Sequence, residues 1–429
     1  MDEEKIIKVE YLARVEGEGA LHLKMKSGKV QEAKLKIFEP PRFFEAFLRE
    51  RLFSEAPDIT ARICGICPVA YQMSSVHAME KILEISPGPE VRLLRRLLYC
   101  GEWIESHVLH IYFLHAPDFF GYDDALEIAR ENADLVKRAL RLKKAGNAIV
   151  RLIGGREIHP INVKVGGFYR TFETSELEEI KSELSDVREI AYETLEFCSG
   201  LDFPDYKNDY TFAALRHETE YPMNEGKLAT NRGLLIDPAE YEDHFQETQV
   251  DYSTTLHTTL NDDLFLTGPL ARYSLNFDRL PGHIQKAALD AGLCETCQNP
   301  FQSILVRAVE TIFAVEEAIS LIDAYEKPDA SFVEAPPRAG EAAAITEAPR
   351  GILYHRYRLD EKGLITDAKI VAPTSHNQKI MEYDLLQVAE RYGNLSEEEL
   401  TRKCETAIRN YDPCISCSTH FLKLKFEEV

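Results

Sequence analysis

Hydrophobic and polar residues alternate over the first 39 residues and recur with a helical period through much of the chain that follows. The alternation around Lys26-Ser27-Gly28-Lys29 predicts a β-hairpin or small meander. From Pro68 to Leu83 the period lengthens towards about 3.6 residues, which predicts a helix. Longer helical patterns follow at 89–116, 124–153, 175–199 and 299–326. Helices of such length favour a bundle with a site between its members.

Three further regions complete the predicted architecture. Residues 203–275 are rich in Tyr, Thr, Asn and Asp, which predicts loops with short strands. Residues 340–373 predict a strand pair that turns at Asp360-Glu361-Lys362-Gly363, and helices are expected at 377–392 and 396–410. We therefore expect an α+β fold, predominantly α, with a long-helix bundle core and small β-sheets at its periphery. A single domain is expected over residues 1–420.

The composition excludes several classes of protein. With 45% hydrophobic and 28% charged residues, the chain is typical of a globular protein. The net charge of -22 argues against a nucleic-acid partner, because binding to phosphates requires a basic surface. The apolar runs are far shorter than the roughly 20 residues that span a bilayer. The first residues lack the basic and apolar regions of a secretory signal. We therefore expect a cytoplasmic protein without a membrane span.

The nine cysteines include three CxxC pairs, at 64/67, 294/297 and 414/417. One pair places two sulfurs within reach of a metal ion, and two pairs can form a four-sulfur site. Structural zinc is the more common use of two pairs. Zinc pairs normally lie within tens of residues of each other, whereas the outer pairs here lie near opposite ends of the chain. Spacing alone leaves zinc and a catalytic metal equally open.

The residues around the outer pairs resemble a known family. Arg62-Ile-Cys64-Gly-Ile-Cys67 and Asp412-Pro-Cys414-Ile-Ser-Cys417-Ser-Thr-His420 are similar to the RxCGxC and DPCxxCxxH motifs of [NiFe] hydrogenase large, catalytic subunits. Five further segments resemble the family in the same order: Arg14-Val-Glu16-Gly, Pro41-Arg42-Phe-Phe-Glu45, Gly155-Arg156 with His159-Pro160, Gly268-Pro-Leu-Ala-Arg272, and Glu347-Ala-Pro349-Arg350-Gly351. Seven ordered matches are far more specific than one motif, and they leave zinc as a remote alternative.

The resemblance implies a Ni-Fe centre with CO and CN ligands on the iron. The implied nickel ligands are the four cysteines of the outer pairs: Cys64, Cys67, Cys414 and Cys417. Of these, Cys67 and Cys417 would also bridge to iron. Heterolytic cleavage of H2 releases a proton, which requires a base with a route outwards. Glu16 matches the family's proton-transfer glutamate, with a solvated strand carboxylate as the alternative.

Other positions are assigned by the same resemblance. Arg350 matches the arginine above the open metal position. Asp118 and Asp412 resemble the acidic residues that orient this arginine. Such partners are needed because burying an unpaired arginine would be costly. Thr374 and Pro349 are expected to contact the ligands of the iron.

Three further expectations concern the surroundings of the centre. Tyr71 stands where the family often has a histidine that hydrogen-bonds a bridging sulfur, so we expect altered tuning without loss of activity. Glu45 and His420 resemble ligands of a second site, for Mg or Fe. Four histidines near the first motif are interpreted mainly as packing residues: His77, His107, His110 and His115. The pair Cys294 and Cys297 has no family role; a labile disulfide, a shared metal and two unrelated thiols all stay open.

The route for electrons must lie on other subunits. The remaining cysteines are too few for an iron–sulfur cluster, and no GxGxxG motif follows a strand. The resemblance implies a small Fe-S subunit and, in the cytoplasmic cofactor-linked group, a diaphorase with flavin that binds NAD(P). Sulfhydrogenases are the most similar group. Ferredoxin/NAD bifurcating, deazaflavin-linked and heterodisulfide-reductase-linked complexes share the same reversible cleavage of H2. Non-catalytic complex I subunits lack the four cysteines, which disfavours that alternative.

Residues 421–429 resemble the extension that a protease removes from many hydrogenase large subunits after nickel insertion, and an ordinary tail is the alternative. We predict that the nickel-loaded chain ends at His420. Intact-mass spectrometry of nickel-loaded enzyme, with chain expressed without nickel as the control, measures this directly. A nickel-loaded chain that keeps residues 421–429 would contradict the prediction.

Overall fold

The computed structural model describes residues 4–26 and 29–419. The α-helices are α1 Phe44–Leu48, α2 Ala56–Thr60, α3 Pro68–Leu83, α4 Pro89–Leu109, α5 Ala116–Phe120, α6 Ala125–Glu131, α7 Ala133–Gly154, α8 Thr174–Ser199, α9 Tyr241–His244, α10 Pro269–Asn276, α11 Gly282–Asp290, α12 Ser303–Asp323, α13 Pro373–Arg391, α14 Glu397–Arg409 and α15 Ile415–Ser418. The strands are β1 Glu4–Val9, β2 Gly19–Lys26, β3 Lys29–Ile37, β4 Val163–Lys164, β5 Gly167–Phe168, β6 Ala213–Arg216, β7 Lys227–Thr230, β8 Leu235–Ile236, β9 Phe245–Thr248, β10 His257–Leu260, β11 Gly340–Ala348, β12 Gly351–Leu359 and β13 Ile365–Val371.

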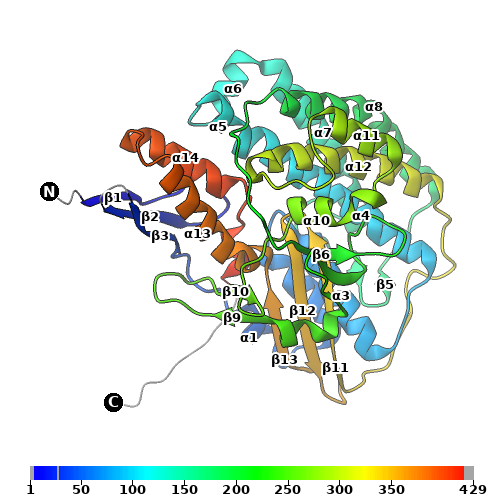
Figure 1. Ribbon diagram of the computed structural model, residues 1–429. Helices are drawn as coiled ribbons and strands as arrows, with labels where there is room; N and C mark the ends of the chain where they lie inside the picture. The colour runs from blue at the N-terminus through cyan, green and yellow to red at the C-terminus, as the bar shows by residue number, and fades with distance from the viewer. Residues whose placement is uncertain (1–3, 27–28, 420–429) are drawn as a thin grey trace, which may run out of the picture.

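The long helices α4, α7, α8 and α12 form a bundle on one side of the molecule (Figure 1). Helices α4 and α7 approach closely because two glycines face each other. A Cβ atom at Gly101 would lie 2.9 Å from the Cβ atom of Ile149, and one at Gly146 would lie 2.8 Å from the Gly101 carbonyl oxygen. No larger residue fits at this crossing without displacing backbone. The α4 residues next to Gly101 are thereby held in a fixed position.

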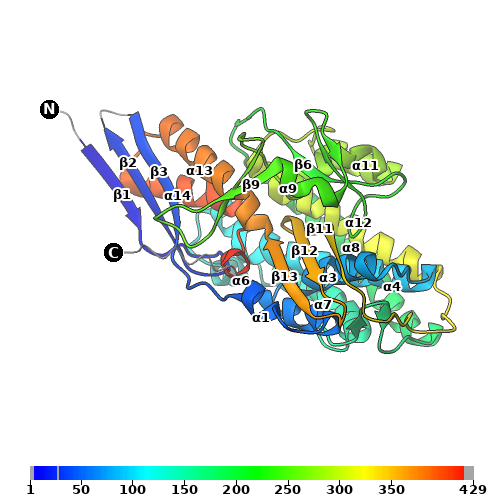
Figure 2. The ribbon, with the colours of Figure 1, turned by 90° about the horizontal axis from the view of Figure 1, so that it is seen from below.

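Three three-stranded antiparallel sheets are present in the described residues, and two of them, besides β6-β7-β8, position the site. Strands β1, β2 and β3 form a meander beside α13 and α14, as the second view shows (Figure 2). Strands β11, β12 and β13 form the other sheet, against which α3 packs. Pro349 and Arg350 make the reversal between β11 and β12, where Gly351 has a φ of 137° that favours glycine. Arg350 is therefore at the end of a hairpin, and its side chain is not part of the strand pattern.

The structure confirms the fold class and most of the predicted long elements. Helix α3 has the predicted bounds, and the strand meander lies where the alternation placed it. The helix expected at 124–153 is wrong in one respect: it is two helices, because the side chain of Asn132 caps a new helix at the amide of Leu135, 3.0 Å away. The pair expected at 340–373 is three strands, since the Pro349-Arg350 reversal was not anticipated. Helices α10 and α11 were not predicted.

A buried ion cluster links α10, α12 and β11. The Arg272 guanidinium donates to Glu310 and Glu347 at 2.8 Å each, and all three side chains are fully buried. The same guanidinium lies over the ring of Trp103, 4.1 Å from its centroid. Removing one member of such a cluster typically costs about 3–5 kcal/mol, because the remaining charge stays buried. This cluster anchors the residues just before Arg350.

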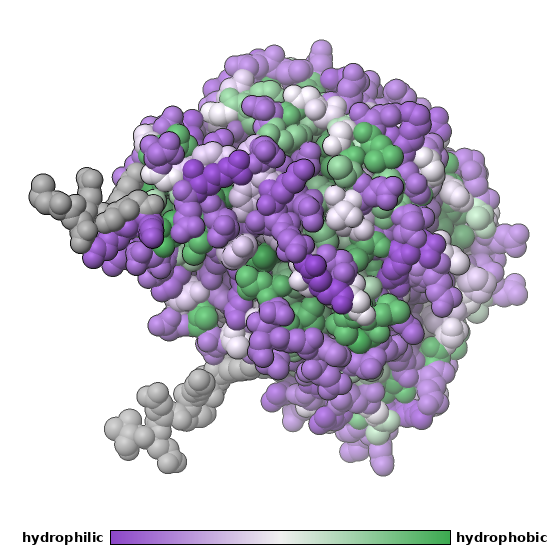
Figure 3. All heavy atoms as spheres, viewed as in Figure 1, coloured by the Kyte–Doolittle hydropathy of each residue, from purple (hydrophilic) through white to green (hydrophobic). Residues whose placement is uncertain are grey.

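The exterior agrees with the strongly acidic composition. The face seen in Figure 3 is mostly hydrophilic, with hydrophobic side chains in scattered groups. None of the helices in the described part of the chain is both long enough and apolar enough to cross a membrane.

Candidate metal centre

Four buried sulfur atoms meet where the two ends of the chain converge. The Sγ–Sγ distances are 2.9 Å between Cys64 and Cys67, 2.9 Å between Cys414 and Cys417, 3.5 Å between Cys64 and Cys414, and 3.8 Å between Cys67 and Cys417. All four lie within 4.8 Å of one another, and among the described residues this is the only such group of Cys, His, Asp or Glu. The two pairs are 350 residues apart in sequence.

The first pair is shaped by the turn that begins α3. The backbone N–H groups of Ile66 and Cys67 donate to the sulfur of Cys64, at 3.3 and 3.1 Å. Cys67 is the N-cap of α3, and its side chain caps no amide of the helix. That sulfur is therefore free to point towards the other pair. Gly65 is exposed, and no atom lies within 4 Å of a Cβ placed there, so this turn reaches the surface.

A carboxylate from α4 supplies the missing cap. Glu102 is fully buried, and its two oxygens accept from the amides of Val69 and Ala70 at 2.6 and 3.1 Å. These are two of the unpaired amides at the start of α3, and Pro68 has no N–H to satisfy. Burial raises the pKa of Glu102 well above its usual value, with nearby Glu105 adding to the effect. Glu102 thus fixes the direction from which Cys67 enters the centre.

The second pair is held by the N-terminal segment and by α13. The Glu16 carbonyl accepts from the amide of Ile415 at 2.9 Å, which forms a parallel bridge between Glu16 and Cys414. The amide of Cys414 donates to the Thr374 hydroxyl oxygen at 2.9 Å, at the start of α13. Backbone and side-chain contacts from two distant parts of the chain therefore orient Cys414.

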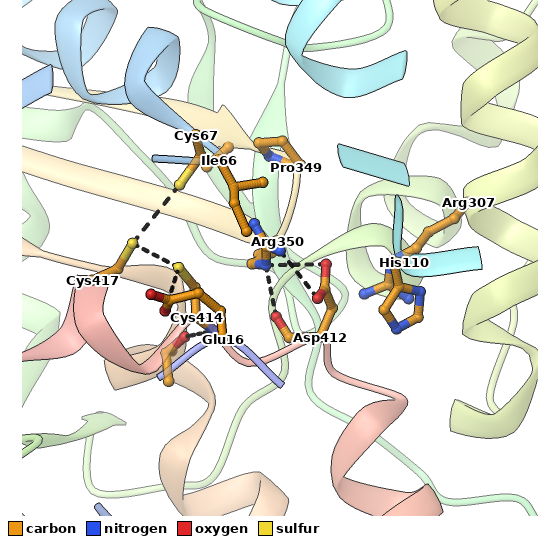
Figure 4. Close-up of polar contacts among 12 residues, drawn as sticks. Glu16, Ile66, Cys67, His110, Arg307, Pro349, Arg350, Asp412, Cys414 and Cys417 are labelled. Atoms are coloured by element: carbon orange, nitrogen blue, oxygen red, sulfur yellow. Dashed lines mark hydrogen bonds and ion pairs between the residues drawn. The ribbon is translucent and has the colours of Figure 1, made fainter. Parts of the chain in front are cut away.

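Glu16 also touches the sulfur directly. Its carboxylate accepts from the Cys414 thiol at 3.1 Å and from the amide of Ser416 at 3.0 Å (Figure 4). The side chain is only partly buried. A carboxylate in contact with a thiol on one side and close to solvent on the other can accept a proton and release it.

The four thiols cannot all ionise without a compensating cation. Burial raises the pKa of Cys64, but hydrogen bonds from the other thiols outweigh it, and the value is well below the ordinary one. The pKa of Cys414 is raised well above the ordinary value by hydrogen bonds with Cys417, Cys64 and Cys67. Like charges at these separations oppose one another. A soft or borderline metal ion removes this penalty, so the donor set fits nickel and iron.

Arg350 lies beside the sulfurs and is bound to Asp412. Its Nε donates to the Asp412 backbone carbonyl at 2.8 Å, and its guanidinium lies 3.0 Å from one carboxylate oxygen and 3.1 Å from the other. Both side chains are buried (Figure 4). Although burial lowers the pKa of Arg350, Asp412 and the cysteines raise it well above its usual value. The site therefore carries a permanent positive charge.

The expectation that Asp118 also orients Arg350 is wrong. The Asp118 carboxylate instead accepts from Arg409 at 2.8 Å by both oxygens, from Arg14 at 2.6 Å, and contacts His115 at 3.1 Å. Asp118 lies in the first turn of α5, where the guanidiniums of Arg14 and Arg409 occupy its carboxylate. It joins the N-terminal segment to α14.

The remaining predicted residues differ in how closely they approach the sulfurs. The Tyr71 hydroxyl lies 3.5 Å from the backbone carbonyl oxygen of Cys417. The Pro349 carbonyl accepts from Arg272 at 3.2 Å. Glu45 accepts from the amide of Ile370 at 2.8 Å. His420, its expected partner in a second metal site, and residues 421–429 lie outside the described residues.

Sequence reasoning missed residues that hold the centre together. Arg42 donates to the carbonyl of Ile63 at 2.6 Å and to that of Ser416, so it ties the two cysteine segments to each other. Asp384 accepts from Tyr411 at 2.6 Å and fixes the residue before Asp412. Arg42 lies within the segment Pro41-Arg42-Phe-Phe-Glu45, which resembles the family, so the sequence did contain a signal that Arg42 has a role. Glu102 and Asp384 lie in regular helices, where the sequence offered none.

Comparisons with known proteins agree with this geometry. A family model described as nickel-dependent hydrogenase matches residues 42–140. The chain is 36% identical to sulfhydrogenase 2 subunit alpha of Pyrococcus furiosus, over 98% of this chain and 100% of that one. It is 29% identical to the NAD-reducing hydrogenase HoxS subunit beta of Cupriavidus necator, over 96% and 94%. A crystal structure of an NAD+-reducing [NiFe]-hydrogenase in the H2-reduced state shares the fold, with a TM-score of 0.88, 24% identity and coverage of 97% and 99%.

The capping role of Glu102 leads to a testable prediction. In Glu102→Gln an amide NH2 group replaces one acceptor oxygen and faces a backbone N–H of α3. We expect a loss of about 1–3 kcal/mol in stability, because a buried donor loses its partner. Denaturant unfolding of the wild type and the variant measures this loss.

Glu105→Gln is the matched control. Glu105 is also buried and lies one turn further along α4, and its carboxylate makes no hydrogen bond among the described residues. Equal unfolding midpoints for Glu102→Gln and wild type would contradict the capping role.

Proposed function

The chain belongs to the nickel-dependent hydrogenase family as the catalytic subunit of a [NiFe] hydrogenase, and we propose that the four buried cysteines bind its Ni-Fe centre as follows. All four cysteines would hold nickel, with Cys64 and Cys414 as ligands of nickel alone and Cys67 and Cys417 as ligands of iron as well. The observation that carries this assignment is the cluster of four buried sulfurs, all within 4.8 Å of one another. The overall reaction is H2 to two protons and two electrons, and it is reversible.

The surroundings of the sulfurs suit the remaining parts of the centre. When bound, nickel and iron supply an electron-accepting position that polarises H2. We propose that the iron carries CO and CN ligands. The Thr374 hydroxyl accepts from the Cys414 amide, which leaves its own hydrogen available for a cyanide nitrogen. Pro349 and Arg350, at the hairpin end, supply an apolar wall and a fixed positive charge.

Glu16 is the proposed outlet for protons. Its carboxylate lies 3.1 Å from the Cys414 sulfur, so a proton on that sulfur has an acceptor within hydrogen-bond distance. The amide of Ser416 holds the same oxygen in place at 3.0 Å. From Glu16 the proton passes to solvent on the side of the N-terminal sheet. Arg350 takes no part in this transfer, because a guanidinium with an adjacent carboxylate keeps its protons.

A second metal site is proposed at Glu45, with His420 as a further ligand. Magnesium suits carboxylate and carbonyl oxygens, and iron is the alternative because histidine nitrogen is unusual for magnesium. One carboxylate oxygen of Glu45 already accepts from the Ile370 amide, which orients the side chain. The ion would join α1 to the C-terminal segment and help to close the centre after maturation.

The electrons leave through partner subunits. We propose a small Fe-S subunit, then a flavin-containing diaphorase that reduces NAD(P). Two similar proteins support a complex of several subunits, since one is named subunit alpha of a sulfhydrogenase and the other subunit beta of an NAD-reducing hydrogenase. The exposed turn at Gly65, between the two cysteines of the first pair, is the proposed route from the sulfurs to the surface. Next to it, His159 contacts the Ala61 carbonyl at 2.8 Å, and its neighbours Ile158 and Ile161 are exposed. Exposed apolar residues beside the turn suit a permanent interface. A cytoplasmic location stays a prediction from the sequence.

Metal analysis tests the assignment of the centre. Purified complex is expected to contain nickel and iron and to show infrared bands of CO and CN. Cys67→Ser should lose these bands and nearly all H2 oxidation, whereas Cys294→Ser, at the exposed cysteine of the third pair, should retain both. Zinc without CO or CN bands in the wild type would rule out the proposal.

The proton outlet is tested separately. Glu16→Gln should keep the metals and the infrared bands but oxidise H2 more slowly by about 10²–10⁴-fold, because the amide cannot accept a proton. Glu18→Gln is the matched control, since that carboxylate is exposed two residues away. Turnover with an artificial electron acceptor is the measurement. Unchanged turnover in Glu16→Gln would refute the outlet, and loss of the metals would indicate a structural role instead.

A further inference from the structure

A small cavity lies behind Asp412, between the first turns of α10 and α12. Its walls include Leu270 of α10, Ser303 and Arg307 of α12, and Asn410. The space open to the centre of a water-sized sphere is about 20 Å³, which admits one water molecule or one ion of similar size. In Figure 4, Arg307 lies beside Asp412 and away from the cysteines. The cavity is therefore distinct from the position between the sulfurs.

Arg307 differs from every other deeply buried arginine in the described part of the chain. The others each form an ion pair at 3.0 Å or less: Arg95 with Glu80, Arg96 with Glu317, Arg272 with Glu310, Arg350 with Asp412, and Arg409 with Asp118. Arg307 is 1% exposed and has no carboxylate within 4 Å among the described residues. Its one hydrogen bond goes to the Asn410 carbonyl at 3.2 Å, and its Nε has no partner. An unpaired buried guanidinium is costly.

The helices around the cavity add to the positive potential. Helices α10 and α12 both begin at its wall, and an N-terminus carries a partial positive charge. Helix α10 has no side-chain cap at its N-cap residue, Gly268. Helix α12 continues from a 3-10 turn at Pro300–Gln302, where the Asn299 side chain accepts from the Phe301 amide at 3.1 Å and the Ser303 amide donates to the Pro300 carbonyl. The Ser303 hydroxyl donates to the Asn410 carbonyl at 2.7 Å. Asn410 and Arg307 both line this small space, and the Nδ2 of Asn410, like the Nε of Arg307, is buried without a hydrogen-bond partner.

The carboxylates closest to Arg307 have other partners. Glu310, one turn along α12, is held by Arg272 at 2.8 Å and contacts His107 at 2.9 Å. Asp412 is bound to Arg350. Burial lowers the pKa of His110 well below its usual value, so this neighbour stays neutral and neither adds nor removes charge. Arg307 is thus the guanidinium of this region whose nearest carboxylates are both held by other arginines.

We propose that the cavity binds one monovalent anion of halide size, with chloride as the natural occupant. The anion accepts from the Arg307 guanidinium and from the side-chain amide of Asn410. It neutralises Arg307, so that this arginine does not compete with Arg350 for the Asp412 carboxylate. The site is independent of the metals, and its occupancy can be tested whether or not the proposed proton route is correct.

Crystals of the holoenzyme prepared with bromide in place of chloride test the site without any variant. Anomalous diffraction at the bromine edge is expected to show a peak in the cavity, within hydrogen-bonding distance of Arg307. Bromide peaks at the surface alone would overturn the proposal. A water molecule, a polyatomic anion or an empty cavity at that position would do the same.

Thermal unfolding of the complete enzyme provides a second test. Replacing chloride by gluconate at constant ionic strength is expected to lower Tm by about 1–3 °C, because an anion that binds only the folded state stabilises it. Arg307→Gln should abolish this dependence. Arg138→Gln, at an exposed arginine paired with Glu193, should retain it. Equal dependence on chloride in both variants would overturn the proposal, and the bromide experiment decides the question if Arg307→Gln does not fold.

Discussion

The meeting of two cysteine pairs that are 350 residues apart is the constraint on which the rest of the structure depends. Bringing such distant segments together costs chain entropy, and four thiols resist ionisation at one point. Contacts outside the centre offset this cost. Arg42 ties both segments by their carbonyls, and the bridge between Glu16 and Cys414 adds the N-terminal segment. These contacts hold the two segments together through groups other than the sulfurs themselves.

Ion pairs surround the cluster of four cysteine sulfurs. Asp412 serves Arg350, and Asp118 serves Arg14 and Arg409. The first pair joins Asp412 of the C-terminal motif to the β11–β12 hairpin. The second joins Arg409, just before that motif, to Asp118 in the first third of the chain. Because each guanidinium has a carboxylate, the interior carries little net charge although the whole chain is strongly acidic. Arg307 is the exception, because the carboxylates nearest to it are bound to Arg272 and Arg350.

The sequence predicted the parts of this arrangement that depend on local pattern or on a motif. The periodicity located helix α3 correctly, and the two motifs located the four cysteines correctly. The partner of Asp118 could not be predicted, because a resemblance assigns a residue type to a position but does not give the direction of the side chain. Glu102 was also hidden, since it lies in the regular pattern of α4 and acts on an amide more than 30 residues earlier. The predicted helix at 124–153 is divided at Asn132 because the side chain of Asn132 caps a new helix there, although the hydrophobic pattern continues.

The proposed outlets for protons and for electrons are separate because the two cysteine pairs come from distant parts of the chain. In the proposed function a proton needs a chain of hydrogen-bonding groups, whereas an electron needs only a short distance. The second pair lies against Glu16, and the carboxylate of Glu39 accepts from the Glu18 amide just beyond it, so acidic groups continue outwards on that side. The turn between the two cysteines of the first pair is exposed at Gly65, so a partner subunit would have room to approach it closely. If both pairs came from one loop, both outlets would open on one face, and the partner that takes the electrons would cover the route of the protons.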